Sequence, residues 1–305
     1  WGAKRLPLGP RISVATVGAI VLATLGVLTW HQAKTYESRK TLWTHNLPRN
    51  PDSHIVLKEW AGVLFNDYRD SKDPAVRNNP AILAKTEKLY RRVTELKPDG
   101  PGGYCDLGTV QYVMAGVELK RGNRARADAL IRSAHRNLQK SIDMEGDYNL
   151  SHFNMYQILW DLGRRQEAIH HLAETVRVRP ANAGTRLMLG ARLVEVGRAH
   201  EAFPHLQEAL RLDPKATEAY RILGQAYRRL GKLHESAAQY RKVVDAQPNH
   251  PVALLDYGTA LAMVRKFPEA QAVLTRAVQV APNNFHAVKH LAIAYHQQGR
   301  GDRAI

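Results

Sequence analysis

Histidine residues near the C-terminal end of the chain have the spacing of a possible metal site. His286 and His290 lie four residues apart, which places them on one face of a helix, and His296 follows further along. Two imidazoles in this arrangement can bind a metal ion if a third ligand is near. No carboxylate stands beside them in the sequence. We therefore expect a polar, partly exposed helix face here and predict no metal ligand.

A second candidate is the acidic segment that contains Asp67, Asp70 and Asp73. Calcium loops of the EF-hand type need oxygen ligands at alternate positions and a late Glu, and this segment has neither, so it predicts a solvated loop. The sequence also lacks a Gly-rich phosphate loop and the HExxH and GxSxG signatures. We predict no catalytic residue and no cofactor in this chain.

The overall charge and the cysteine content limit the classes of partner. The 305 residues carry a net charge of +16 and one cysteine, Cys105. A single cysteine excludes an intrachain disulfide and a Cys-based zinc site. The positive charge favours anionic partners such as lipid headgroups or acidic proteins. Because the basic residues are scattered and do not form a stripe, no nucleic acid is expected as a partner.

An apolar run near the N-terminus has the length of a membrane span. It extends from Ile12 to Trp30, through Val21 and Leu25, without a formal charge. Its length of about 19 residues is enough to cross a hydrocarbon core of roughly 30 Å. A buried core helix or a cleavable signal peptide is the alternative, but the run ends in WHQ, a poor cleavage site. We predict one retained transmembrane helix, with its flanks, over residues 1–40.

The orientation of this span stays open, because positive residues flank it on both sides. We expect a bacterial inner membrane, with the following region on the periplasmic side or, as the alternative, on the opposite side. The chain starts at Trp1 and stops at Ile305 within an unfinished helix pattern. We therefore interpret it as part of a longer protein.

The second half of the chain repeats with a period of 34 residues. Small residues at two positions of the period would let two helices approach closely, turn glycines would end the first helix, and prolines would end the second. These positions are Gly190, Gly224, Gly258 and Ala292; Ala168, Ala202, Ser236, Ala270 and Ala304; Gly163, Gly197, Gly231 and Gly299, with Arg265 as the exception; and Pro180, Pro214, Pro248 and Pro282.

This pattern resembles the tetratricopeptide repeat family over residues 149–305. The resemblance implies an all-α solenoid of antiparallel helix pairs, with the last pair truncated. Residues 41–148 resemble divergent units of the same kind, beginning with a half unit at 41–53. The two full units in this part are longer than the period, so we predict extended regions between their helices.

The resemblance also implies that the first helix of each unit lines a concave groove. The inward positions are Phe153, Gln157 and Trp160 in one unit, Arg221, Gln225 and Arg228 in another, and His286, Lys289 and His296 in the last. The groove thus changes from aromatic to basic and predicts a protein partner with acidic segments. Alternatively, Phe153 and Trp160 pack against a neighbouring helix. The Lys–Asn clamp for C-terminal carboxylates is not found in these units.

Two functions are consistent with these features. The first is a membrane-anchored scaffold or accessory subunit that binds proteins and contacts membrane lipid. The second follows from residues 11–60, where a span leads directly into an LW…NP.S half repeat. This junction resembles the last span and repeat tail of bacterial polytopic glycosyltransferases related to the O-mannosyltransferases. That resemblance implies catalytic acids upstream of this chain.

Overall fold

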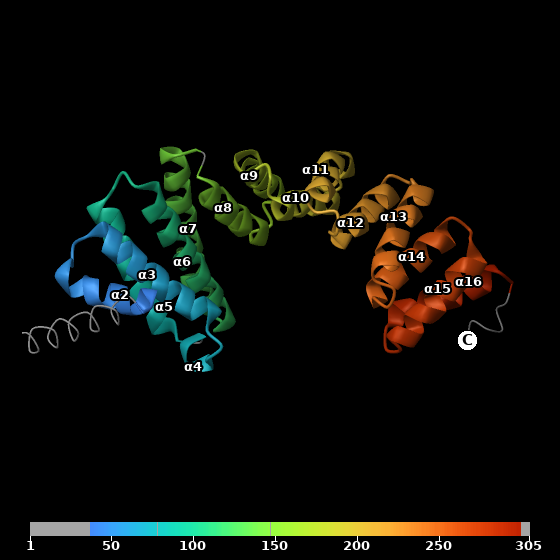
Figure 1. Cartoon of the computed structure of the whole chain (residues 1–305), viewed down its shortest axis with the longest axis horizontal. Helices are drawn as coiled ribbons and strands as arrows, with labels where there is room; N and C mark the ends of the chain where they lie inside the picture. The colour runs from blue at the N-terminus through green and yellow to red at the C-terminus, as the bar shows by residue number, and fades with distance from the viewer. Residues whose placement is uncertain (1–36, 78, 147, 300–305) are drawn as a thin grey trace, which may run out of the picture. The chain divides into compact units, whose positions relative to one another are not determined.

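The computed structural model describes residues 37–77, 79–146 and 148–299 (Figure 1). Two compact units, Trp1–Glu145 and Gly146–Ile305, divide the chain, and each is described by itself. The described residues form helices and connecting turns, without a strand. The predicted span Ile12 to Trp30 lies outside the described residues. Within the described ranges, no helix combines the length and the hydropathy that crossing a membrane requires.

The first unit contains two helical hairpins preceded by a short helix. Arg39–Asn46 forms α2, a single 3-10 turn follows at Leu47–Arg49, and His54–Asp70 forms α3. The remaining helices of this unit are α4 (Pro74–Arg77), α5 (Pro80–Leu96), α6 (Pro101–Lys120) and α7 (Arg124–Met144). In this unit α3 pairs with α5 and α6 pairs with α7. Their starts have local causes, because Ser53 caps α3 through its side chain and prolines occupy the first turns of α5 and α6.

The hairpin of α6 and α7 corrects one expectation from the sequence. The extra residues of this unit do not form an extended connection. Instead α6 and α7 have 20 and 21 residues, against 13 and 14 in α8 (Asn149–Asp161) and α9 (Arg165–Val178), and only residues 121–123 connect them. Each helix is therefore seven residues longer (20 − 13 and 21 − 14), which is close to two turns. Whole turns keep the apolar face in register, so the hairpin lengthens without a longer loop.

The acidic segment of the first unit is also more ordered than a solvated loop. Asp67 and Asp70 belong to the last turns of α3, where Asp67 pairs with Lys40 at 3.0 Å and Asp70 pairs with the adjacent Arg69. Asp73 accepts a hydrogen bond from the backbone N–H of Ala75 at the start of α4. Asp73 thus stabilises the start of α4, and Asp67 and Asp70 form ion pairs at the surface.

The second unit confirms the predicted array of antiparallel helix pairs. Its remaining helices are α10 (Ala183–Glu195), α11 (Ala199–Leu212), α12 (Thr217–Arg229), α13 (Leu233–Ala246), α14 (Pro251–Met263), α15 (Phe267–Val280) and α16 (Phe285–Gln297). The first helices α8, α10, α12, α14 and α16 each begin 34 residues after the preceding one. Each second helix ends two residues before its periodic proline, as the sequence predicts.

Two backbone features explain why the repeat keeps its glycines. A Cβ atom added to Gly224 would lie 2.8 Å from the ring of Tyr240, so only glycine permits this distance between α12 and α13. Gly197 ends α10 with a φ of 86°, in the left-handed region that favours glycine. Arg265 takes the equivalent place with a φ of 64°. Both the close crossing and the left-handed turn confirm the sequence prediction.

The core of the second unit lies between the two helices of each pair and between successive pairs. Ala202 and Ala270 are fully buried, and the Ser236 hydroxyl donates to the Gly224 carbonyl at 2.8 Å. First helices also contact first helices, as α10 does with α12 and α14 with α16. We call the surface formed by the first helices α8, α10, α12, α14 and α16 the first-helix face.

Candidate functional site

The predicted aromatic end of the groove is closed by the chain itself. Trp160 is only 9% exposed. The guanidinium of Arg165 stands over its ring at 4.0 Å, and that of Arg192 at 4.4 Å. Arg192 also donates to the hydroxyl of Tyr156 at 2.9 Å. Because cation–π contacts cover the indole, Trp160 joins the α8–α9 pair to α10 and has no open ring face for a ligand.

The other two aromatic-end positions have different surroundings. Phe153 is half-buried, with its ring centroid 5.9 Å from that of Tyr156. Gln157 is exposed. Trp160 is therefore buried against neighbouring helices, which is the alternative that the sequence left open. Gln157 is accessible to a partner, and Phe153 is partly accessible.

Arg221 and Arg228 lie on the first-helix face of α12, but only one of them is free of an ion pair. Arg221 donates through Nε to Glu218 at 2.7 Å, and this hydrogen bond raises the pKa of Arg221. Arg228 is exposed and forms no ion pair with any residue that the structure describes. Gln225, between them, is half-buried. The charge available to a partner from α12 is therefore that of Arg228.

A buried carboxyl group lies under this part of the face and was not predicted. Asp256 of α14 has an oxygen, Oδ2, that is buried and has no hydrogen-bond partner among the described residues. Burial raises the pKa of Asp256, while Arg221 and Arg228 oppose this rise. Burial and the nearby Asp256 also raise the pKa of Tyr240 to about 12.

The helix α16 adds one lysine and three histidines to the second unit. Lys289 and His286 are exposed there, and His290 is half-buried. Burial lowers the pKa of His290, and the neighbouring Lys289, His286 and Arg228 lower it further. The side chains that share this electrostatic influence are Arg228 of α12 and His286, Lys289 and His290 of α16. We call them the basic cluster. His296, in the last turn of α16, is exposed but exerts no resolved influence on His290.

The sequence contains a signal for Asp256, which was missed, and for His290, which was expected only as part of a polar helix face. Asp256 and His290 are both the sixth residue of their first helix, where α10 and α12 have Met188 and Ile222. A polar residue in place of the apolar residues of α10 and α12 would have drawn attention to both. Among the described residues, no three His, Cys, Asp or Glu side chains come together in the manner of a metal site.

Comparison with known proteins supports the repeat assignment. The tetratricopeptide repeat family model matches residues 187–251 and 255–305. The crystal structure of YrrB, a TPR protein with an unusual peptide-binding site, has a TM-score of 0.53 and 19% identity over 66% of this chain and 97% of that chain. MamA from Desulfovibrio magneticus RS-1 has a TM-score of 0.49 and 20% identity over 58% of this chain and 97% of that chain.

No curated protein sequence matches the chain. At 19% identity, the likeness to YrrB concerns the fold. The fold, the 34-residue helix spacing and the family match agree over the second half of the chain. The second unit therefore has the helix-pair architecture of tetratricopeptide repeats, and the family model matches it over residues 187–251 and 255–305.

Proposed function

We propose that the chain is a membrane-anchored scaffold that binds a protein partner through the first-helix face of its second unit. The observation that carries this proposal is the basic cluster of Arg228, His286, Lys289 and His290. Arg228 and Lys289 are exposed and form no ion pair with any described residue. YrrB has a peptide-binding site on the same fold, which favours a peptide segment as the ligand class.

The charges of the face define the chemistry of this segment. Glu218 pairs with Arg221, whereas Arg228 forms no ion pair with a described residue and acts only electrostatically on the buried Asp256. The positive surplus therefore lies toward α16, where Lys289 and the two histidines add to it. An acidic segment should bind there, and its electrostatic contacts should affect the encounter rate and selectivity more than the final affinity.

A charge-reversal pair tests the site. Arg228→Glu combined with Lys289→Glu should weaken binding of a fluorescein-labelled hexaglutamate peptide by roughly tenfold or more, equivalent to about 1.4 kcal/mol. The full chain is titrated by fluorescence anisotropy at low salt. The matched control is Lys215→Glu with Lys232→Glu, which changes the net charge equally at two exposed turn residues without ion pairs.

Equal losses in both double variants would show that bulk charge, and not the basic cluster, attracts the peptide. Wild-type protein that does not bind the peptide saturably would also contradict the site. Histidine protonation provides an independent check. Binding should tighten as the pH falls and His290 gains charge, and this gain should come late because the pKa of His290 is lowered.

The membrane anchor is supported by the sequence of residues 12–30 alone. If it spans a bilayer, alkaline carbonate will leave the intact chain in the membrane pellet. A variant that lacks residues 1–33 should move to the supernatant. Release of the intact chain by carbonate would rule out the span and leave the peptide-binding proposal unaffected.

A further inference from the structure

The first unit contains a pocket of about 510 Å³ between the end of α3, the short helix α4 and the last turns of α6. We call it the α4–α6 pocket. The charged side chains that line it are all basic, and they are those of Arg69, Arg77, Lys120 and Arg121. No described aspartate or glutamate lines it. The pocket therefore presents positive charge from three separate segments of the chain.

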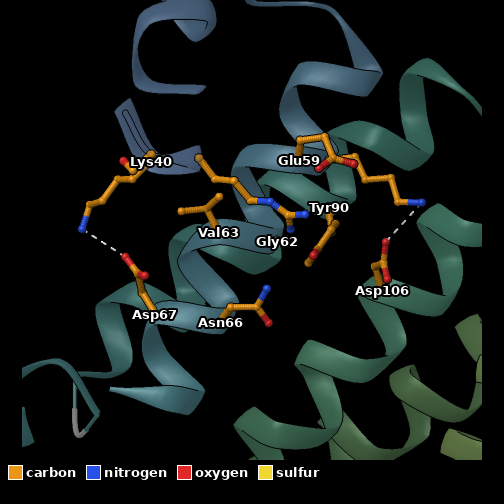
Figure 2. A pocket seen from close by; sticks show the side chains of 11 residues that line it. Lys40, Glu59, Gly62, Val63, Asn66, Asp67, Tyr90 and Asp106 are labelled. Atoms are coloured by element: carbon orange, nitrogen blue, oxygen red, sulfur yellow. Dashed lines mark hydrogen bonds and ion pairs between the residues drawn. The ribbon is translucent and has the colours of Figure 1, made fainter. Parts of the chain in front are cut away.

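The cavity between α3 and α6 that Figure 2 shows has a different charge pattern. Three basic and three acidic side chains line that cavity. Lys40 pairs there with Asp67 at 3.0 Å, and Lys58 Nζ lies 3.6 Å from Asp106 Oδ2 (Figure 2). The charges of that cavity balance within the chain, whereas those of the α4–α6 pocket do not.

Two of the four basic residues of the α4–α6 pocket have a carboxylate partner outside its lining. Arg69 Nε pairs with the adjacent Asp70 at 2.8 Å, and Arg121 Nη1 lies 3.4 Å from Glu118. A guanidinium has five N–H donors, so each arginine keeps donors for a ligand beside its ion pair. These two arginines can orient an anion, although their charge is already compensated.

The other two basic residues have no such partner. Arg77 and Lys120 are exposed and form no ion pair with any described residue. Asp73, four residues before Arg77, instead accepts a hydrogen bond from the backbone N–H of Ala75. The α4–α6 pocket thus has a surplus of two positive charges.

Gly116 provides a second, independent observation. It lies in the interior of α6, where glycine destabilises a helix relative to alanine. Nothing lies within 4 Å of a Cβ added to Gly116, so helix packing does not require glycine there, in contrast to Gly108 of the same helix. Gly116 lines the pocket on the same helix face as Val113 and Lys120. The missing side chain keeps this face of the pocket open.

We propose that the α4–α6 pocket binds the phosphate group of a phosphate monoester. Such a group carries about two negative charges near neutral pH, which matches the surplus from Arg77 and Lys120. A carboxylate would leave one of these positive charges uncompensated. Guanidinium groups such as those of Arg69 and Arg121 can also donate paired hydrogen bonds to phosphate oxygens.

The size and the walls of the pocket favour an ester over inorganic phosphate. A water molecule occupies about 30 Å³ of the liquid, so a pocket of about 510 Å³ has room for a phosphate group and an organic substituent. The half-buried side chains of Tyr68, Val113 and Val117 line the part of the pocket that the basic residues do not. An apolar substituent on the phosphate should therefore pack there.

Calorimetric titration of the full chain in a neutral detergent, at low salt and pH 7.5, tests this proposal with a matched pair of probes. Phenyl phosphate should bind saturably. Phenyl sulfate has nearly the same shape and one negative charge fewer, so it should bind at least about tenfold more weakly. Equal binding of the two probes, or no saturable binding of phenyl phosphate, would overturn the proposal. Tighter binding of inorganic phosphate would overturn the choice of an ester.

A double substitution locates the binding in the pocket. Arg77→Gln combined with Lys120→Gln should weaken binding of phenyl phosphate by roughly tenfold or more. The matched control is Lys88→Gln with Arg136→Gln, which removes the same charge at two exposed helix residues outside the pocket that form no ion pair with a described residue. Because the chain has a net charge of +16, equal losses in both variants would assign the binding to bulk charge and refute the site.

Gly116 allows a test that changes no charge. Gly116→Leu should place a side chain in the pocket and weaken binding of phenyl phosphate by roughly tenfold, while Gly116→Ala should weaken it less. Circular dichroism should show an unchanged helical content in both variants. Full binding by a folded Gly116→Leu variant would contradict the site.

The pH dependence should follow the ligand, because no described histidine or carboxylate lines the pocket. Binding of phenyl phosphate should weaken as the pH falls through about 6, where a phosphate monoester takes up its second proton. Affinity that stays constant from pH 7.5 to pH 5 would show that the second negative charge is not recognised, which contradicts the proposal.

Two further probes distinguish a lipid headgroup from a soluble ester. Glycerol 3-phosphate and dihexanoyl phosphatidic acid have the same headgroup, without and with acyl chains. Tighter binding of the lipid supports a membrane lipid as the source of the phosphate. Equal or tighter binding of glycerol 3-phosphate supports a soluble ester, and failure of both to bind would overturn the proposal.

Discussion

Gly224 provides the most direct test of the repeat geometry. In a Gly224→Ala variant the new Cβ would lie 2.8–2.9 Å from three ring atoms of Tyr240. Carbon atoms in favourable contact lie about 3.5–4.0 Å apart, so the ring or the helix must move by roughly 0.7 Å. Tyr240 is 1% exposed and has no free space to move into.

Two opposing effects set the magnitude. Overpacking a well-packed core costs about 1–3 kcal/mol. Alanine in a helix interior is favoured over glycine by roughly 1 kcal/mol. The free energy of unfolding should therefore fall by up to about 2 kcal/mol in Gly224→Ala. Gly116→Ala in α6 is the matched control, because nothing lies within 4 Å of its added Cβ, and it should be stabilised by about 0.5–1 kcal/mol.

Hydrogen exchange of the amides in α12 and α13 is the suitable assay, because repeat arrays can open locally and not as one unit. A double-mutant cycle with Tyr240→Ala identifies the cause. With the ring removed, Gly224→Ala should stabilise the protein by roughly 1 kcal/mol, which gives a coupling energy of about 1–3 kcal/mol. Equal stabilisation of Gly224→Ala and Gly116→Ala, or a coupling energy near zero, would refute the close crossing.

Three other predictions follow from single side chains. Arg265→Gly should raise the free energy of unfolding by about 0.5–1 kcal/mol, because it relieves a left-handed φ of 64°, and urea unfolding measures the gain. Asp106→Asn should raise stability by about 1–2 kcal/mol at pH 7.5 and by little at pH 4. The folded pKa near 6 exceeds the unfolded value, so wild-type stability declines as the pH rises from about 4 to 6. Arg192→Met should cost about 1–2 kcal/mol in urea unfolding through the lost contacts with Trp160 and Tyr156, while the same change at exposed Arg179 should not.

The periodic part of the fold was predictable from the sequence because a single physical reason explains the residue type at each repeated position. Close crossings require small residues, left-handed turns favour glycine, and prolines limit the second helices. The extended units were predicted less well. The extra residues of α6 and α7 are ordinary helix formers, so their composition alone does not separate a longer helix from a loop. Gly122, with a φ of 78°, marks the short turn between them and could have located it.

The candidate site was predicted only in part. The charge that a groove offers to a partner depends on ion pairs between side chains, which a sequence does not reveal. Arg228 and Lys289 are accessible as expected. The charge of Arg221, in contrast, is held by Glu218, and the ring of Trp160 is covered by arginines of two other helices. These outcomes depend on the rotamers and the register of neighbouring helices, which the 34-residue pattern leaves undetermined.

One position of the repeat carries ionisable residues in both units. The sixth residue of each first helix is, in chain order, Glu59, Asp106, Asn154, Met188, Ile222, Asp256 and His290. Where this residue is apolar, in α10 and α12, it can be buried without a partner. Asp106, Asp256 and His290 are partly removed from water, and this burial raises the pKa of the two carboxyl groups and lowers that of His290, whereas Glu59 is exposed. Burial of an ionisable group destabilises the fold, and core packing does not offset this cost. The partly buried ionisable residues at this position are therefore the ones that we expect to contribute to binding.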